Sequence, residues 1–309
     1  MKVINFMGQR KMAMFFSLVL LAVSIGSLAT RQLNWGLDFT GGTLVEVHYS
    51  SSASLTAIRG TLETKGFAGA TVVSFGSDRD VMIRLPQGYS DERGAELLGL
   101  LQQAFVAVEP DGSVELRRSE FVGPQVGDEL REQGGLAMLL ALGLVTLYVA
   151  FRFQLKFALG SVAALIHDVV ITLGFFSVTG MEFDLTVLAA LMAVIGYSLN
   201  DTIVVFDRIR ENFRKIRRAE PSEVLNISIT ETLDRTLVTS GTTLLVVIAL
   251  ALFGGEMIFG FAITLIVGIT IGTYSSIYVA SATALVLGVT KEDLMIPVKE
   301  GVEQEDLTP

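Results

Sequence analysis

The sequence predicts an α-helical multi-pass membrane protein with six transmembrane helices. One exported α+β domain of ferredoxin-like βαββαβ order is expected between helices 1 and 2. Apolar residues make up 51% of the 309 residues and charged residues only 18%, whereas soluble domains carry about 25% charge. Six apolar runs approach the roughly 20 residues that a membrane span needs. A single connection between these runs is long enough to fold on its own.

The apolar runs cover residues 12–30, 136–151, 157–178, 185–206, 237–253 and 258–287. The first run follows Lys2, Arg10 and Lys11 and ends in small residues, so it reads either as a retained helix or as a cleaved secretory signal. Its length exceeds the usual signal core of about 7 to 15 residues. A retained first helix is therefore favoured.

The distribution of Lys and Arg sets the orientation. The opposing short loops 179–184 and 254–259 contain acidic residues and no Lys or Arg, whereas the other links are basic. The positive-inside rule then places both termini in the cytoplasm. The basic cluster 208–218 is interpreted as this topological anchor, in preference to a binding patch for lipid or a partner. The predicted organisation is a cytoplasmic N-terminus with helix 1 (1–31), an exported, periplasmic domain (32–132), helices 2 to 6 (133–289, with a basic cytoplasmic loop at 207–235) and a cytoplasmic tail (290–309).

The exported segment shows the alternation and turn signals of a small α+β fold. In order, it predicts a strand at 43–49, a helix at 53–65, a hairpin of 70–75 and 80–85, a second helix opening at 90–92, and a last strand at 113–116. Such an order is the ferredoxin-like split unit, which by itself implies no activity. His48, on the polar face of the first strand, reads as a surface residue rather than a catalyst.

Both junctions of this domain are rich in glycine. The hinge candidates are Gly36, Gly41 and Gly42 on entry and Gly123, Pro124 and Gly127 on exit. Glycine permits positive φ and close backbone approach, whereas proline stiffens the chain. Two interpretations remain: a pair of tight turns that lift the domain off the bilayer, or a hinge that permits a rigid-body swing.

Polar residues interrupt the apolar runs at three places. Asp201 lies near the inner end of the fourth run and Arg235 at the inner start of the antiparallel fifth, so an ion pair between them is geometrically plausible. A desolvated carboxyl can have its pKa raised by about 3 to 5 units, and an approaching guanidinium lowers it again, which would load and unload a proton. The alternative is that Asp201 and Asn200 only join helices by hydrogen bonds. His167 and Asp168 in the third run read equally as a relay or as a buried, satisfied pair.

The sixth run carries small residues at four-residue spacing, including Gly260, Gly268, Gly272 and Ser276. Such a stripe predicts close packing of another helix, from this chain or from a partner.

Several function classes are excluded by composition. The absence of Cys and the presence of only two His argue against redox, disulfide and transition-metal chemistry, and no Walker loop binds ATP. A net charge of −9 argues against a nucleic-acid partner. No catalytic constellation appears, so neither an enzyme nor a cofactor is expected, with protons as the coupling ion.

Five segments resemble the SecF side of the SecD/SecF family of protein-export membrane proteins: 36–42, 122–124, 167–168, 196–212 and 272–280. The resemblance implies half of a resistance-nodulation-division assembly in the bacterial inner membrane, completed by SecD. It also implies proton-driven help to late preprotein translocation beside the SecYEG channel and the SecA motor, with YajC and YidC as further expected partners. The family's proton site falls on Asp201 and Arg235, with Asn200 and Thr202 as neighbours. A passive scaffold, and half of a proton-driven exporter of small amphiphiles or lipids, are the alternatives.

Overall fold

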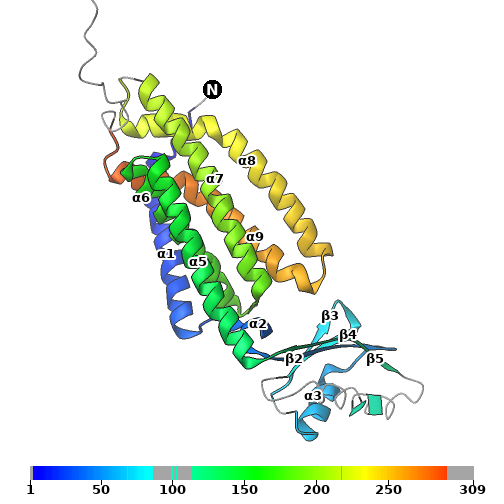
Figure 1. The fold of residues 1–309 in the computed structure, drawn as a ribbon. Coiled ribbons are helices and arrows are strands. Elements are labelled where there is room, and N and C mark those ends of the chain that lie inside the picture. Colours follow the sequence, from blue (N-terminus) through cyan, green and yellow to red (C-terminus); the bar gives the residue numbers. More distant parts are fainter. Residues whose placement is uncertain are drawn as a thin grey trace, which may run out of the picture.

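The predicted bundle of six long apolar helices is confirmed. The computed structural model describes residues 3–67, 69–85, 99–100, 102–103, 113–216 and 218–290. Within this part of the chain, six helical segments are long and apolar enough to cross a membrane. They contain α1 (Arg10–Thr30, preceded by the short η1, Met7–Gln9), α5 (Pro124–Arg152), α6 (Leu155–Thr179), α7 (Leu185–Lys215), α8 (Pro221–Phe253) and α9 (Glu256–Ser275), which continues through the π-helical η2 (Ser276–Ala280) into α10 (Ser281–Val286). Figure 1 shows the N-terminus at one end of this bundle and the small sheet at the other.

Helices α7 and α8 extend beyond the predicted membrane runs, so the expected loop 207–235 is mostly helical. Hydropathy marks the part of a helix that lies in lipid, whereas backbone hydrogen bonding continues into water. The polar ends pack on each other: Arg208 Nε donates to Glu231 Oε2 at 2.6 Å, and Asn212 Nδ2 donates to Ser228 Oγ at 3.0 Å. Helix α8 restarts at Pro221, a residue suited to the first helical turn because it lacks a backbone N–H.

The exported domain has the predicted sheet. Strands β2 (Gly42–Tyr49), β3 (Thr71–Phe75), β4 (Ser77–Leu85) and β5 (Val114–Val122) lie in the order β3-β4-β2-β5, and each pair is antiparallel. Helix α3 (Leu55–Thr64) follows the first of them, as expected. This order is the ferredoxin-like one. The second predicted helix, opening at 90–92, falls almost entirely outside the described residues.

One face of strand β2 forms the core of the domain. Val45, Val47 and Tyr49 are buried, as their alternation predicts, and pack with Ile58 and Leu62 of α3. His48 on the other face is partly exposed, and its Nδ1 lies 2.6 Å from Asp80 Oδ1. It is therefore a surface residue with a carboxylate partner.

The domain is attached to the end of the bundle opposite the N-terminus (Figure 1), by short elements that the sequence did not suggest. Strand β1 (Asn34–Trp35) pairs in parallel with β6 (Glu182–Phe183), which connects α6 to α7. The one-turn α2 (Leu37–Thr40) follows; its Phe39 is buried and stacks on Phe183 with ring centroids 6.0 Å apart. Arg84 of β4 forms an ion pair with Glu182. The β-sheet domain thus contacts the connection that leads into α7.

Candidate functional site: buried carboxyl groups inside the helix bundle

Asp201 lies inside α7, facing α8. Its residue is only 8% exposed, and its Oδ1 accepts a hydrogen bond of 2.7 Å from Thr236 Oγ1. Its second oxygen, Oδ2, is buried and has no hydrogen-bond partner among the residues that the structure describes. A buried, unpaired carboxylate oxygen is costly in a membrane interior, so this atom is suited to bind a proton or to meet a group that is not in this chain.

Asp201 and Arg235 lie at the facing ends of α7 and α8, as the sequence suggested, but among the described residues no salt bridge joins them in this structure. Arg235 is exposed on α8, and Thr236 beside it contacts Asp201. Successive residues on a helix are rotated by about 100°, so when Thr236 faces α7 its neighbour Arg235 is turned outward.

His167 and Asp168 lie at the middle of α6 and form a better-connected site than the sequence indicated. Asp168 is fully buried, and its Oδ1 lies 2.9 Å from His167 Nδ1. Its Oδ2 accepts hydrogen bonds from Ser198 Oγ of α7 at 2.5 Å and from Ser275 Oγ of α9 at 2.7 Å. This carboxyl group therefore joins three helices.

The remaining predicted polar residues divide between the interior and the surface. Thr202 is buried, and its Oγ1 lies 2.9 Å from Ser276 Oγ. Asn200 is exposed on the outside of α7. Sequence reasoning missed Ser198, Ser275 and Thr236 as partners of the carboxyl groups. The available signal was the presence of Ser and Thr on apolar helices at three- and four-residue intervals, where they hydrogen-bond across helices.

The small residues of α9 pack against α7 of the same chain, which settles the alternative that the sequence left open. A Cβ atom added at Gly268 would lie 2.2 Å from Val194, and one at Gly260 would lie 2.9 Å from Val187. At Gly272 the nearest atom would be Ser198 Cβ, at 3.0 Å. These close approaches bring Ser275 and Ser276 of the sixth span within hydrogen-bond distance of α6 and α7.

The glycine-rich junctions are mostly packed turns. Gly42 has φ +134°, and an added Cβ would lie 2.5 Å from the carbonyl oxygen of Leu85. A Cβ at Gly36 would lie 2.9 Å from Glu182 Oε1, and one at Gly127 would lie 2.9 Å from the backbone nitrogen of Gly41, which itself has φ +67°. Gly123, directly before the start of α5, has nothing within 4 Å of such an atom. Close packing thus explains three of these glycines, and Gly123 is the position with room for a hinge.

No metal-binding cluster is found in the part of the chain that the structure describes: no three His, Asp or Glu side chains gather there as possible ligands. The chemistry that the described interior offers is the protonation of carboxyl and imidazole groups.

The comparison with protein families identifies the chain. Residues 102–290 match the family described as "Protein export membrane protein SecD/SecF, C-terminal", and residues 26–53 match the "SecD/SecF GG Motif". The first match contains the buried carboxyl groups, and the second contains Gly36, Gly41 and Gly42.

Individual relatives agree with this match. The chain is 58% identical to "Protein translocase subunit SecF" of Vibrio alginolyticus over 99% of this chain and 97% of that protein. It is 53% identical to the protein of the same name from Pseudomonas aeruginosa over 95% and 94% of the two chains. The crystal structure of SecDF, a translocon-associated membrane protein from Thermus thermophilus, is 40% identical over 93% of this chain with a TM-score of 0.82, and this chain spans 39% of that protein. A second SecDF structure, in a super-membrane-facing form, gives a TM-score of 0.69. The relatives are named as components of protein transport, and the chain belongs to the SecD/SecF family of protein-export membrane proteins.

Proposed function

We propose that this chain is the subunit that, together with SecD, uses the proton gradient to promote late stages of preprotein translocation across the bacterial inner membrane. The names of the relatives support a role in protein export, and the solved SecDF structures support a SecD partner. The observation that carries the proton role is the geometry of Asp201, whose buried Oδ2 has no partner.

The face of α7 and α8 that is turned away from the rest of the bundle is the proposed docking surface for SecD. Polar and small residues are exposed there on helices that would otherwise face lipid, where polar groups are costly. They are Thr186, Ala189, Ala193, Gly196 and Asn200 of α7 and Arg235, Thr239 and Thr242 of α8. A carboxylate of the partner helix would compensate the charge of Arg235 and complete the proton site next to Asp201.

Proton binding at Asp201 can act on the exported domain through α7. The helix begins at Leu185, whose backbone N–H donates to Asp38 Oδ2 at 3.0 Å, and Asp38 belongs to α2 at the entry of the domain. Arg84 adds the ion pair to Glu182. Each proton that moves down 100 mV releases about 2.3 kcal/mol, enough to change a two-state equilibrium by more than tenfold. A small shift of α7 would therefore displace the domain that meets the preprotein.

The proposed location is the inner membrane with both termini in the cytoplasm. The positive-inside distribution of Lys and Arg supports this orientation, and the ribbon places the N-terminus at the end of the bundle opposite the exported domain (Figure 1). SecYEG, SecA, YajC and YidC are proposed partners through the family resemblance alone. The chain is proposed to have no enzymatic activity of its own, and no cofactor besides the transported protons.

Two other functions make different predictions for the same residue. A passive scaffold of the translocon would not require a titratable group at position 201. Half of an exporter of small amphiphiles or lipids would require one, but its transport would not depend on a preprotein.

The test is preprotein translocation into inverted membrane vesicles that contain the SecD complex with either the wild-type chain or Asp201→Asn. We expect an uncoupler to slow wild-type translocation, and the variant to run at the uncoupled rate while still co-purifying with SecD. Thr270→Val, an exposed position on α9 outside the proposed docking surface, is the control. Equal rates for Asp201→Asn and wild type, with equal sensitivity to the uncoupler, would reject the proton role.

A further inference from the structure

The His167–Asp168 pair is isolated from other charges in the membrane interior. The two residues are 3% and 0% exposed, and in the described part of the chain the ion pairs of Asp168 involve no Lys or Arg. Its other partners are the neutral hydroxyls of Ser198 and Ser275. An ionised carboxylate in such surroundings is disfavoured, because neutral hydrogen-bond donors replace only part of its lost hydration and no fixed positive charge balances it. An ionised Asp168 beside a neutral His167 carries one negative charge. The pair therefore becomes electrically neutral only when it binds one further proton.

The geometry leaves one atom free to exchange that proton. Nδ1 of His167 faces Asp168, whereas Nε2 is buried without a hydrogen-bond partner. In the state with a protonated Nδ1 and an unprotonated Nε2, addition of a proton at Nε2 gives an imidazolium beside the carboxylate. Removal of that proton restores the neutral ring. The hydrogen bonds from Ser198 and Ser275 hold the carboxyl group in place in both states.

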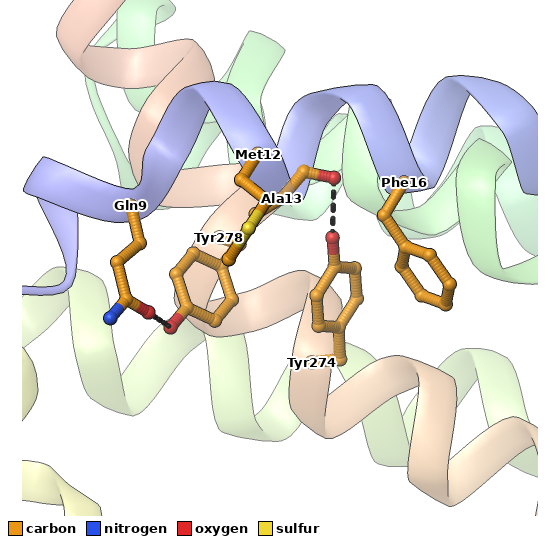
Figure 2. Close-up of a pocket in the computed structure, with 6 residues that line it drawn as sticks. All are labelled: Gln9, Met12, Ala13, Phe16, Tyr274 and Tyr278. Atoms are coloured by element: carbon orange, nitrogen blue, oxygen red, sulfur yellow. Dashed lines mark hydrogen bonds between the residues drawn. The ribbon is translucent and has the colours of Figure 1, made fainter.

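A cavity lies close to this imidazole. The ring of His167 stacks on Tyr274 with centroids 6.3 Å apart and an interplanar angle of 29°. Tyr274 in turn lines a cavity of about 350 Å³ between α1 and the α9–η2 segment, together with Gln9, Met12, Ala13, Phe16 and Tyr278. Figure 2 shows the Tyr274 hydroxyl directed at the carbonyl oxygen of Ala13, to which it donates at 2.6 Å. Most of the residues that line this cavity are apolar, and Met12 and Phe16 are exposed on the outside of α1, so the cavity is an apolar groove at the surface of the bundle.

The helix backbone is irregular at the same level. The π-helical η2 begins at Ser276, directly after Ser275, which donates to Asp168. Single π-helical turns inside α-helices are frequent at functional sites, because they alter the direction of neighbouring side chains. The irregular turn also contains Tyr278, a second residue of the cavity wall.

We propose that His167 and Asp168 form a second intramembrane proton-binding site, with Nε2 of His167 as the atom that accepts the proton. It lies in series with Asp201, because Ser198 bonds Asp168 and lies one helical turn from Asp201 on α7. Among the described groups that face the pair, Tyr274 is the titratable residue of α9, and α1 contributes the Ser17 hydroxyl, 3.1 Å from the Tyr274 hydroxyl. Asp201 of α7 faces α8 instead, where it bonds Thr236. Proton binding by the pair stands on its own, whereas the serial arrangement rests on the proposed function.

The composition of the chain makes this site directly measurable. The sequence contains only two histidines, so ¹⁵N-histidine labelling of His48→Gln leaves His167 as the single imidazole signal. We expect the ¹⁵N shifts of the full chain in lipid nanodiscs to report reversible protonation of this ring as the pH is changed. In Asp168→Asn the pH dependence of the signal should change, because the carboxylate beside Nδ1 is removed.

Two further variants keep the test decisive. Ser275→Ala removes one hydrogen-bond donor to Asp168 and should also change the pH dependence of the imidazole signal. It covers the case in which Asp168→Asn does not fold. Ser77→Ala, in the exported domain, should leave the signal unchanged. An imidazole signal that stays constant over the whole pH range, or that has the same midpoint in wild type, Asp168→Asn and Ser275→Ala, would overturn the proposal.

The translocation assay separates this proposal from the proposed function. If His167 titrates as expected and Asp168→Asn reduces gradient-driven translocation severalfold, both sites belong to one pathway. If His167 titrates but wild-type translocation does not depend on the proton gradient, the second proton-binding site is supported and the proposed function is rejected. If Asp201→Asn removes gradient dependence while the His167 signal stays constant with pH, the proposed function stands and the second site is rejected.

Discussion

Thr236 of α8 donates a hydrogen bond of 2.7 Å to Asp201 of α7, and Arg235, which precedes it in sequence, is turned to the outside of the bundle. The bond positions one carboxyl oxygen and leaves the other, Oδ2, buried and unpartnered. Asp201 is thus held at the interface of two helices with one oxygen available. This arrangement fits a group that alternates between a protonated state and a charge-paired state.

Replacement of Thr236 by Val should weaken the contact between α7 and α8. Hydrogen bonds between membrane helices contribute about 0.6 to 2 kcal/mol, so a lower unfolding temperature in detergent and slower gradient-driven translocation are expected. Thr236→Ser restores the donor and should recover both. Thr270→Val, exposed on α9, is the control. An unchanged unfolding temperature for Thr236→Val would show that the bond contributes nothing to stability.

Replacement of Gly268 by Ala should destabilise the packing of α9 on α7. The added methyl group would lie 2.2 Å from Val194, a β-branched residue with little freedom to move aside. Overpacking of this kind costs about 1 to 3 kcal/mol. Gly241→Ala on α8 is the matched control, because an added Cβ there meets no atom within 4 Å. Thermal unfolding of the two variants should differ clearly, and equal stability would contradict the close approach of α7 and α9.

The two interpretations of the glycine-rich junctions can be separated by Gly42 and Gly123. Gly42→Ala should destabilise the exported domain, because φ of +134° is strained for any other residue and the methyl group would contact the Leu85 carbonyl. Gly123 has φ −64° and ψ 146°, which other residues adopt readily, so Gly123→Ala should fold normally. If Gly123 is a hinge, translocation falls in Gly123→Ala although stability is retained. Normal translocation in Gly123→Ala would reject the hinge and leave tight turns as the remaining interpretation.

The exported domain should lose stability in acid through Asp80. Its carboxylate accepts hydrogen bonds from Ser77 Oγ and His48 Nδ1, each at 2.6 Å, and these bonds lower the pKa of Asp80 below the ordinary value of 3.8, with Arg117 adding to the effect. A lowered pKa in the folded state means that the stabilisation is complete above the ordinary value and is lost as the pH falls below it.

Thermal unfolding of the domain in the full chain at about pH 3 and about pH 6 measures this effect. Asp80→Asn should be less stable than wild type at the higher pH and should show a smaller loss on acidification. Asp78→Asn removes an exposed carboxylate nearby and should keep the wild-type pH dependence. If the stability of Asp80→Asn fell on acidification as steeply as that of the wild type, groups other than Asp80 would cause the acid sensitivity.

The elements of the fold could largely be predicted because each depends on local sequence. Apolar runs give the six membrane helices, and alternation in residues 43–49 gives the strand whose Val45 and Val47 are buried. The helix ends were less predictable: α7 and α8 extend into the loop expected at 207–235, since hydropathy does not record where a helix stops in water. The pairing of β1 with β6 joins two short segments far apart in sequence, and no local pattern marks them.

The site was predicted only in part, because local sequence marks the carboxyl groups but not the residues that contact them. A carboxyl group in an apolar helix stands out, so Asp201 and Asp168 were recognised. Their partners depend on which residues face each other across helices. Arg235 was expected to pair with Asp201 because of its charge, but the helical rotation places Thr236 there instead. Ser198 and Ser275 are ordinary in membrane helices, and only the packing of α6, α7 and α9 brings them to Asp168.

The most direct measurement of the central claim is difference infrared spectroscopy of the full chain in lipid with its SecD partner as the pH is changed. If Asp201 takes up and releases a proton, acidification produces the carbonyl band of a neutral carboxyl group, and Asp201→Asn removes that band while Thr270→Val on α9 keeps it. A carboxyl group at position 201 that stays ionised throughout, with identical spectra for wild type and Asp201→Asn, would contradict the account.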